Sequence, residues 1–345
     1  MPPLPPRWLR RLLIAPAIVT LGVLVALFTP ALLFVAAGIS YKLPGKWRPL
    51  RLLGLAFVYL ALQVVGLAAA FGLWVASGFG WRLRSPAFTT AHYGLLRGLL
   101  AVLWGAAKRL VNTHVVTDGP RVPAYDDDPD TIERPLIVMS RHAGPGDSFL
   151  LIHEVLSWAG RRPRIVLKAD MQWDPLIDVL LNRLPCDFID NAPGSGERTL
   201  QRIGELAGSM DVPDAFVIFP EGGNFTEGRR VRAIDRLRSS GLDDAALRAE
   251  RLRYTLPPRP SGVAAALAAR PEADVVVVAH TGLDDLTTPL ELWRSIPMDK
   301  TLRMSWQVFH PGTVPSDPEA LVEWLNETWA AMDDWIERHR NGSAA

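Results

Sequence analysis

Hydrophobic positions dominate two long stretches near the N-terminus of the chain. No charged residue lies between Leu12 and Tyr41, or between Leu52 and Trp81. Each stretch is longer than the roughly 20 residues that an α-helix needs to cross the hydrocarbon core of a bilayer. We therefore expect two membrane helices joined by a short loop, which form an N-terminal membrane hairpin.

The first apolar stretch has two alternative interpretations. A cleaved signal peptide is disfavoured, because the apolar core of such a peptide has roughly 7–15 residues and because a second apolar stretch follows closely. Pro16 and Pro30 lie inside the first stretch, and a proline inside a helix removes a hydrogen bond and bends the helix. A kinked span and a re-entrant or interfacial hairpin therefore both remain open.

Basic and aromatic residues flank both apolar stretches. Slightly more basic residues lie on the side of the chain termini than in the hairpin loop, which favours a cytoplasmic position for both termini. Tryptophans near the ends of the stretches suit the headgroup layer. Arginine far outnumbers lysine, as in proteins from GC-rich bacteria, so we expect a bacterial inner-membrane protein whose remaining chain faces the cytoplasm. The flanking residues are Arg7, Arg10, Arg11, Lys42, Lys46, Arg48, Arg51, Arg82, Arg84 and Arg97, with Trp8, Trp47, Trp74 and Trp81.

From Leu136 onward, short runs rich in β-branched residues alternate with helical patterns. This alternation is typical of an α/β domain with a mixed, largely parallel sheet flanked by helices. A final amphipathic helix follows a cap at Ser316 or Asp317 and is expected to pack on the domain. The expected strands are 136–139, 164–167, 187–189, 215–219, 275–279 and 302–309, and the expected helices are 147–158, 175–184, 197–210, 243–252 and 262–269.

These patterns divide the chain into a membrane hairpin at 1–81, a connector at 82–135, an α/β domain at 136–310 and a C-terminal helix at 311–345. The connector contains a cluster of aspartates bounded by prolines. Such a cluster is able to bind a divalent cation, but a solvated loop at a domain boundary explains it more simply. The aspartates are Asp126, Asp127, Asp128 and Asp130.

Composition narrows the classes of function. Of the 345 residues, 49% are hydrophobic and 21% are charged, which excludes a disordered chain. The 37 basic and 36 acidic side chains leave a net charge of +1, so no overall charge attracts nucleic acid and we expect no such partner. The single cysteine, Cys186, excludes an internal disulfide framework and a multi-thiolate zinc site.

Candidate catalytic residues follow the first expected strand of the domain, since ligands of a parallel sheet gather at the carboxyl ends of its strands. Four residues separate His142 from Asp147, and Gly144 and Gly146 among them allow a sharp turn that brings the two side chains together. A carboxylate bonded to one imidazole nitrogen orients the ring and raises the basicity of the other nitrogen. The pair therefore predicts a general base for a hydroxyl, with Asp147 also at the helix N-cap. A simple helix cap beside an unrelated loop histidine is the alternative.

A second motif follows the strand expected at 215–219. The sequence Phe-Pro-Glu-Gly-Gly-Asn at 219–224 places Glu221 on a glycine-rich turn at the same sheet edge as His142. A structural glutamate is the alternative. Together the two motifs resemble those of the glycerolipid acyltransferase family of the lysophosphatidate type. In that family a His-x4-Asp block precedes a Phe-Pro-Glu-Gly block, in a domain attached to N-terminal membrane helices.

Further segments share this resemblance, which covers most of the chain from about 136 to 335. They match a lysine-to-proline segment after the first block, the second block with its following segment, and a Pro-Arg-x-x-Gly segment of the eukaryotic-type branch. These segments are 168–175, 187–191, 197–200 and 256–262. Their common order makes the resemblance more specific than any one block.

The resemblance implies acyl transfer to 1-acylglycerol-3-phosphate as the favoured acceptor, with phosphatidic acid as the product. A lysophospholipid hydroxyl attacks the acyl thioester of coenzyme A or an acyl carrier protein, with His142 as the base and Asp147 orienting it. The acceptor hydroxyl is the nucleophile, so neither a covalent enzyme intermediate nor a cofactor is required. Arg141, the amides of Gly144 and Gly146, or the helix N-terminus are the candidate donors to the oxyanion.

Two positions depart from the family pattern. Asn191 and Asn224 stand where the family has arginines, and asparagine offers no charge to a phosphate. Either nearby arginines replace them, or the acceptor is another lysophospholipid or a glycolipid. The candidate substrate-binding residues are Arg141, Gly144, Asn191, Arg198, Glu221, Gly222, Arg229 and Arg259, with Arg230 as a further arginine near these blocks.

Two other classes of function are open. A catalytically silent protein would use the same pocket to bind a lipid or a partner. A metal-dependent lipid phosphohydrolase would use His142, Asp147 and Glu221 as ligands, but no histidine pair at helical spacing supports it, and we expect no metal. His280 follows the strand at 275–279 and is interpreted as a structural histidine at the edge of the site.

Overall fold

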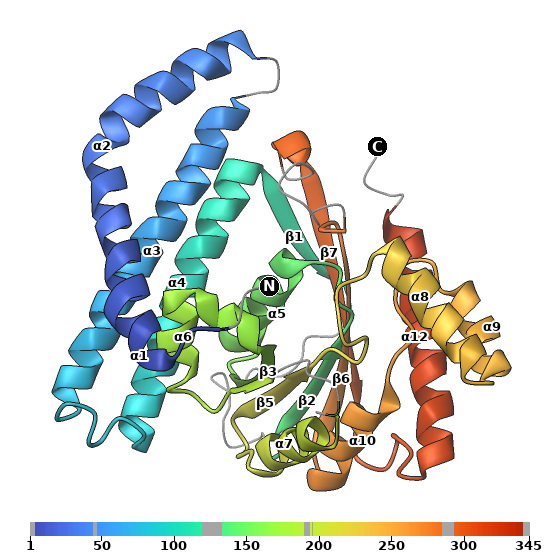
Figure 1. Cartoon of the computed structure of the whole chain (residues 1–345). Coiled ribbons are helices and arrows are strands. Elements are labelled where there is room, and N and C mark those ends of the chain that lie inside the picture. Colours follow the sequence, from blue (N-terminus) through green and yellow to red (C-terminus); the bar gives the residue numbers. More distant parts are fainter. Residues whose placement is uncertain are drawn as a thin grey trace. The chain divides into compact units, whose positions relative to one another are not determined.

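The computed structural model describes residues 4–43, 47–118, 133–189, 194, 196–284 and 293–340. The chain forms two compact units, each built from several segments (Figure 1). The helical unit contains Met1–Thr113, Val166–Ala192 and Trp293–Asp299, and the sheet unit contains His114–Ile165, Pro193–Leu292 and Lys300–Ala345. The aspartate cluster at 126–130 and Asn191 lie outside the described residues, so the interpretations of both stay predictions.

The N-terminal hairpin contains the longest helices of the chain. A short α1 (Arg7–Leu9) and a π-helical turn η1 (Arg10–Ile14) lead into α2 (Ala15–Lys42), and α3 (Arg48–Ala76) returns alongside α2 (Figure 1). Both apolar segments are long enough and apolar enough to cross a membrane. Pro30 lies inside α2 without ending it.

The outer surface of α2 is strongly apolar. Phe34 is 82% exposed and Leu27 is 70% exposed, and other large apolar side chains of the helix are exposed as well. A soluble monomer rarely exposes so large a contiguous apolar surface. This surface suits lipid.

Further segments of the helical unit pack against α3. These are α4 (Pro86–Val111) and α6 (Pro175–Leu181), which the turn η3 (Ala169–Trp173) precedes. Small residues allow the close approach, because a Cβ atom at Gly66 of α3 would lie 2.7 Å from the Cδ1 atom of Leu176 in α6. One side of α3 is therefore covered by protein.

A seven-stranded sheet has the order β1-β7-β6-β2-β5-β3-β4. The strands from β2 to β6 pair in parallel, and β7 runs antiparallel to β6. The prediction of a mixed, largely parallel sheet flanked by helices is confirmed. The strands are β1 (Thr113–Asp118), β2 (Leu136–Ser140), β3 (Arg162–Lys168), β4 (Asp187–Ile189), β5 (Asp214–Ile218), β6 (Asp274–Thr281) and β7 (Lys300–Phe309).

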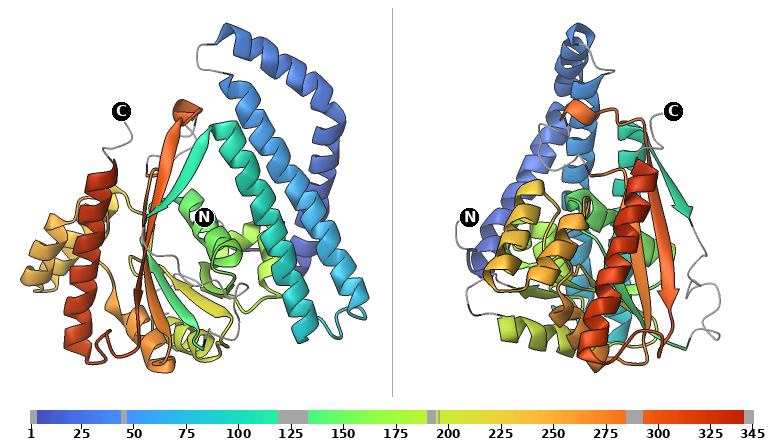
Figure 2. Two further views of the ribbon diagram at one scale, coloured as in Figure 1. Left: turned by 180° about the vertical axis from the view of Figure 1, so that it is seen from behind. Right: turned by 90° about the vertical axis from the view of Figure 1, so that its right-hand side faces the viewer.

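The middle strands are buried because helices cover both faces of the sheet. Every residue of β2 and β5 is buried, as the continuous apolar runs of parallel strands require. Figure 2 shows α12 (Pro318–Arg340) on one face and α5 (Pro145–Ser157) on the other. Trp306 of β7 and Trp329 of α12 are among the largest fully buried side chains, and a buried aromatic ring removes roughly 150–250 Å² from water.

Four more helices complete the sheet unit. They are α7 (Gly196–Gly208), α8 (Glu227–Ser239), α9 (Asp243–Arg251) and α10 (Pro260–Ala269). The helix α7 packs against α10, and α8 packs against α9. Because α8 begins just after the turn that follows β5, its first arginines lie near the carboxyl end of that strand.

The six predicted strands are all present, with bounds that differ by no more than two residues at either end. The hydrophobic patterns missed β1, α4 and α8. The strand β1 lies at one end of the sheet and exposes half of its residues. The arginine-rich helix α8 buries only Ile234, so it has almost no apolar periodicity to detect.

Candidate active site

The loop between β2 and α5 carries both residues of the His-x4-Asp block. The strand ends at Ser140 and the helix begins at Pro145, with Gly144 as an extended N-cap residue. Asp147 is therefore the third residue of the helix and not its N-cap, which corrects the sequence-based prediction. From this position its carboxylate turns back and accepts hydrogen bonds from the amides of Ala143 and Gly144, the latter at 3.0 Å.

His142 lies directly against this carboxylate. Its Nδ1 atom is 3.2 Å from Oδ1 and 3.4 Å from Oδ2 of Asp147, and its ring stacks on Phe219 with 4.7 Å between the ring centroids. The His142 side chain is 18% exposed and the Asp147 side chain is 1% exposed. Among the described residues, none hydrogen-bonds Nε2 of His142. The loop thus places a buried carboxylate behind a partly exposed imidazole.

The carboxyl group of Asp147 is ionised at physiological pH. Burial by itself raises its pKa, but the hydrogen bond from His142, the neighbouring His280 and the Gly144 amide outweigh burial and lower the pKa to about 2. A carboxylate bound at Nδ1 keeps the proton of the neutral imidazole on that nitrogen. Nε2 is then the nitrogen that accepts a proton from a substrate.

The Phe-Pro-Glu-Gly turn lies next to the loop between β2 and α5. Gly222 has a φ of +68°, a left-handed conformation that glycine adopts without a steric penalty. The amide of Phe225 donates to the carbonyl oxygen of His142 at 2.6 Å. Glu221 is 2% exposed, and its Oε1 atom accepts from the indole N–H of Trp329 at 3.3 Å. A hydrogen bond therefore connects the two motifs, and the side chain of Glu221 lies in the interior.

Burial dominates the electrostatics of Glu221. It raises the pKa of this carboxyl group to about 8, while the Arg141 guanidinium and the hydrogen bond from Trp329 act in the opposite direction. Among the described residues, no group of three His, Cys, Asp or Glu side chains is arranged to hold a metal ion. Glu221 is therefore placed to stabilise the turn from within the core.

Arg141 is anchored beyond the end of β6. Its side chain is 1% exposed and pairs with Asp284. The hydroxyl of Thr281 and the amide of Gly282 both donate to the same carboxylate at 2.9 Å. Burial lowers the pKa of Arg141 to about 10, against the influence of nearby carboxylates. The guanidinium belongs to an internal ion pair.

The contacts of the loop narrow the set of candidate oxyanion donors. The Gly144 amide is bonded to Asp147. Arg141 pairs with Asp284 through Nη2, while its Nε and Nη1 atoms have no hydrogen-bond partner among the described residues. The amide of Gly146 lies in the first turn of α5, where amides have no partner within the helix. Gly146 and Arg141 therefore remain as candidates.

His280 approaches the same carboxylate from β6. Its side chain is 4% exposed, and its Nε2 atom is 3.6 Å from Oδ2 of Asp147 and 3.3 Å from the carbonyl oxygen of Arg141. Burial, assisted by the charge of Arg141, lowers the pKa of His280 to about 4. The ring is therefore neutral at pH 7, and the contact with a carbonyl oxygen places its proton on Nε2.

Two of the predicted substrate-binding arginines lie over the glycine turn. A Cβ atom at Gly222 would be 3.0 Å from Nη1 of Arg259, and one at Gly223 would be 3.4 Å from Nη1 of Arg229. Arg229 also donates to the carbonyl oxygen of Asn224 at 2.9 Å. These two guanidinium groups occupy the region where the family pattern has an arginine in place of Asn224.

The other predicted arginines have different surroundings. Arg198 lies exposed in the first turn of α7. Arg230 bonds the carbonyl oxygens of Leu252 and Glu250, at 2.5 and 2.8 Å, so it links α8 to the end of α9.

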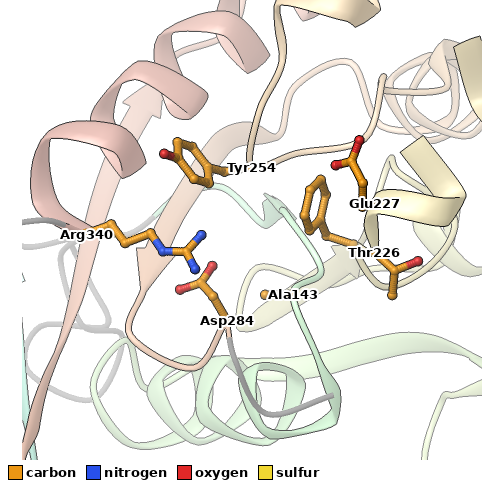
Figure 3. Close-up of a pocket in the computed structure, with 7 residues that line it drawn as sticks. Ala143, Thr226, Glu227, Tyr254, Asp284 and Arg340 are labelled. Carbon is orange, nitrogen blue, oxygen red and sulfur yellow. The ribbon is translucent and has the colours of Figure 1, made fainter. Parts of the chain in front are cut away.

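A pocket of about 250 Å³ adjoins the loop between β2 and α5 at Ala143. Tyr254 and Arg340 lie together on one side, where the Arg340 guanidinium is 5.2 Å from the centroid of the tyrosine ring, and Arg340 points toward Asp284 (Figure 3). The pocket wall contains both signs of charge and an aromatic ring. The complete lining is Ala143, Phe225, Thr226, Glu227, Tyr254, Asp284 and Arg340.

Sequence patterns missed several residues of this centre. Asp284 follows β6 at the carboxyl end of the strand, where ligands gather, so its position in the sequence could have marked it as a site residue. Trp329 lies in the last amphipathic helix, whose apolar positions indicate packing on the domain and no contact with a particular residue. Asp333, one turn further along α12, accepts from the amides of Arg253 and Tyr254 at 2.9 and 2.8 Å.

Comparison with known proteins supports one class of activity. Residues 115–281 match the acyltransferase family model. This match supports a relationship to the glycerolipid acyltransferases, and acyl transfer to a lipid acceptor. Comparisons with the curated proteins and with the solved structures found no match.

The lowered pKa of Asp147 predicts a pH-dependent contribution to stability. The ionised form stabilises the folded chain above the ordinary pKa of 3.8, and this contribution is lost as the pH falls toward about 2. We expect Asp147→Asn to be less stable than the wild type at pH 6, and the difference to shrink by about 2 kcal/mol between pH 5 and pH 2. Unfolding by denaturant, followed by tryptophan fluorescence at each pH, measures it. Asp235→Asn, at an exposed site of α8, is the control, and a pH-independent difference would contradict the assignment.

Proposed function

We propose that this protein is a membrane-bound O-acyltransferase. It moves a fatty acyl group from acyl-CoA or an acyl carrier protein to the free hydroxyl of a lysophospholipid, with 1-acylglycerol-3-phosphate as the first candidate and phosphatidic acid as its product. The observation that carries the proposal is the pairing of a partly exposed His142 with a buried, ionised Asp147. The pair lies within the segment that matches the acyltransferase family.

The geometry suits direct transfer between the two substrates. Nε2 of His142 removes the proton from the acceptor hydroxyl while the hydroxyl oxygen attacks the thioester carbon. The negative charge on the carbonyl oxygen is stabilised by the first-turn amide of Gly146 or by Arg141. When the tetrahedral intermediate collapses, the carbon–sulfur bond breaks and the thiolate takes the proton back from His142. Asp147 stabilises the imidazolium between these steps and itself stays ionised.

Removal of the base tests this mechanism. We expect His142→Ala to lower kcat by about 10²–10⁴-fold, which is the usual contribution of a general base. The assay supplies labelled acyl-CoA or acyl carrier protein with lysophosphatidate in detergent and follows the diacyl product. His153→Ala, on the helix α5 that follows the loop of His142, is the matched control.

Two results would contradict the mechanism. Unchanged turnover in His142→Ala would exclude the base assignment. Binding of lysolipid by the wild type without transfer from either donor would favour the catalytically silent lipid-binding protein.

The acceptor phosphate is proposed to bind at the glycine turn. Arg259 and Arg229 lie over Gly222 and Gly223, one strand away from His142 in the sheet. Two guanidinium groups are suited to a phosphate, because each presents several N–H donors in a plane. They would supply the charge that Asn224 lacks.

Charge removal tests the phosphate site. We expect Arg229→Gln and Arg259→Gln each to raise the KM for lysophosphatidate roughly tenfold, equivalent to one charge-assisted hydrogen bond, and to leave transfer to monoacylglycerol unchanged. Arg232→Gln, at an exposed arginine of α8, is the control for surface charge. Arg198→Gln tests the remaining candidate. If all four variants had the same KM for lysophosphatidate as the wild type, the natural acceptor would carry a different head group.

The hairpin is proposed to attach the protein to a bilayer, with the sheet unit in the cytoplasm of a bacterium. The exposed apolar surface of α2 supports lipid contact, whereas α3 has polar partners outside the hairpin at three levels of its length. Arg48 donates to the carbonyl oxygen of Ile296 at 2.6 Å near the start of the helix. Gln63, at its middle, donates to Asp174 at 2.8 Å. Near its end, the carbonyl oxygen of Ala70 accepts from Arg183 at 2.6 Å.

A buried ion pair lies beside the same hairpin. Arg10 pairs with Asp178 of α6 at 2.6 Å, with side chains 5% and 1% exposed, and also donates to Gln172 at 2.9 Å. Arg10 lies at the end of the helix opposite the hairpin loop, so this pair can stay at the headgroup level in either arrangement. Arg48 and its partner Ile296 lie at the loop end of α3, and a spanning hairpin would carry the segment of Ile296 across the bilayer as well. This favours the interfacial alternative, in which α2 enters one leaflet and the hairpin loop does not cross.

Cysteine labelling distinguishes the two arrangements. In a Cys186→Ser background we expect Leu43→Cys, at the loop end of α2, to stay unlabelled by an impermeant maleimide applied to the periplasmic side of sealed vesicles. Ser239→Cys, on exposed α8, should be labelled only from the cytoplasmic side and reports vesicle orientation. Labelling of Leu43→Cys from the periplasmic side would show that the hairpin spans the membrane.

A further inference from the structure

A second imidazole contacts the catalytic carboxylate, and the mechanism above does not use it. His280 is the last but one residue of β6, which is the strand paired with β2. It is buried, with Nε2 at 3.3 Å from the carbonyl oxygen of Arg141 and at 3.6 Å from Oδ2 of Asp147. A neutral imidazole has a single N–H, and here that N–H faces two acceptors of the catalytic loop.

The end of β6 holds the residue that precedes His142 in two ways. His280 binds the backbone carbonyl of Arg141, and Asp284 binds its guanidinium. The following carbonyl, that of His142, accepts from Phe225 of the glycine turn. The loop between β2 and α5 is therefore anchored from both neighbouring strands, β6 and β5.

The groups that face His280 determine the charge of its ring. Arg141 and His142 face it from the loop after β2, and Asp147 faces it from α5. On β7 its partner in the sheet register is the apolar Met304. The ring is neutral at pH 7, so it acts on the carboxylate as an oriented dipole and adds no competing positive charge beside His142.

We propose that His280 is a positioning residue for acyl transfer: its Nε2–H donates to the Arg141 carbonyl beside Oδ2 of Asp147, and so holds the loop in the place where Nδ1 of His142 meets Oδ1 of Asp147. The activity part of this proposal rests on the proposed function, whereas the positioning of His142 does not. A side chain that fills the same volume without an N–H donor leaves the Arg141 carbonyl unpaired in the interior, so the loop that carries His142 loses its bond to β6.

The test compares a donor with an apolar side chain at position 280. In His280→Gln the amide nitrogen reaches the place of Nε2, and in His280→Met the volume is kept without a donor. We expect His280→Met to lower kcat roughly tenfold or more, because it leaves one buried acceptor without a hydrogen bond. The KM for both substrates should change by less than about twofold. His280→Gln should restore kcat to within about threefold of the wild type. Equal kcat values in the two variants would show that His280 contributes packing alone.

The pH profile gives a readout that packing does not move. With the loop less well held, the imidazolium of His142 lies less closely against Asp147 and is less stabilised, so the acid limb of kcat/KM shifts to lower pH in His280→Met and returns in His280→Gln. An unshifted acid limb in His280→Met would overturn the proposal.

A measurement without substrate separates this proposal from the assigned reaction. Histidine labelled with 13C at Cε1 allows the environment of the His142 ring to be followed by NMR at one fixed pH, with its signal assigned by its loss in His142→Ala. The Cε1 chemical shift of His142 should differ in His280→Met from the value that the wild type and His280→Gln share. If no acyl transfer is found but this difference is present, the proposed function fails and the positioning role stands. If His280→Met does not fold, His280→Asn replaces it, because its shorter amide does not reach the Arg141 carbonyl.

Discussion

The carboxylate of Asp147 is the group on which the geometry of the candidate active site depends. It accepts from the amides of Ala143 and Gly144 and from the imidazole of His142, so one buried anion shapes the loop and orients the ring at the same time. Burial alone would neutralise this acid, and the donors around it reverse that effect. The loop conformation and the ionised carboxylate therefore stabilise each other, and neither persists without the other.

The strands and the two motifs of the site were predictable because each has a local signal. The β-branched runs predicted six strands, and four intervening residues with two glycines predicted that His142 and Asp147 meet. Contacts made by residues far apart in the chain have no such signal. Trp329 reaches Glu221 across 108 residues, and nothing near either residue in the sequence marks the pair. The capping error at Asp147 has a similar origin, since Gly144 supplies no side chain to show that the helix already begins there.

Two kinds of surface meet the needs of a lipid substrate in different ways. The apolar side of α2 has no hydrogen-bonding partner to offer and suits acyl chains. The glycine turn has exposed backbone and two guanidinium groups close to it, which suit a charged head group.

The last helix, α12, makes contacts that complete the candidate site. Through Trp329 and Asp333, α12 binds the glycine turn and the segment that precedes α10. Trp329 lies 108 residues after Glu221 in the sequence. The glycine turn therefore gains its last interior contacts only when α12 docks, so its local conformation depends on a late, long-range step of folding.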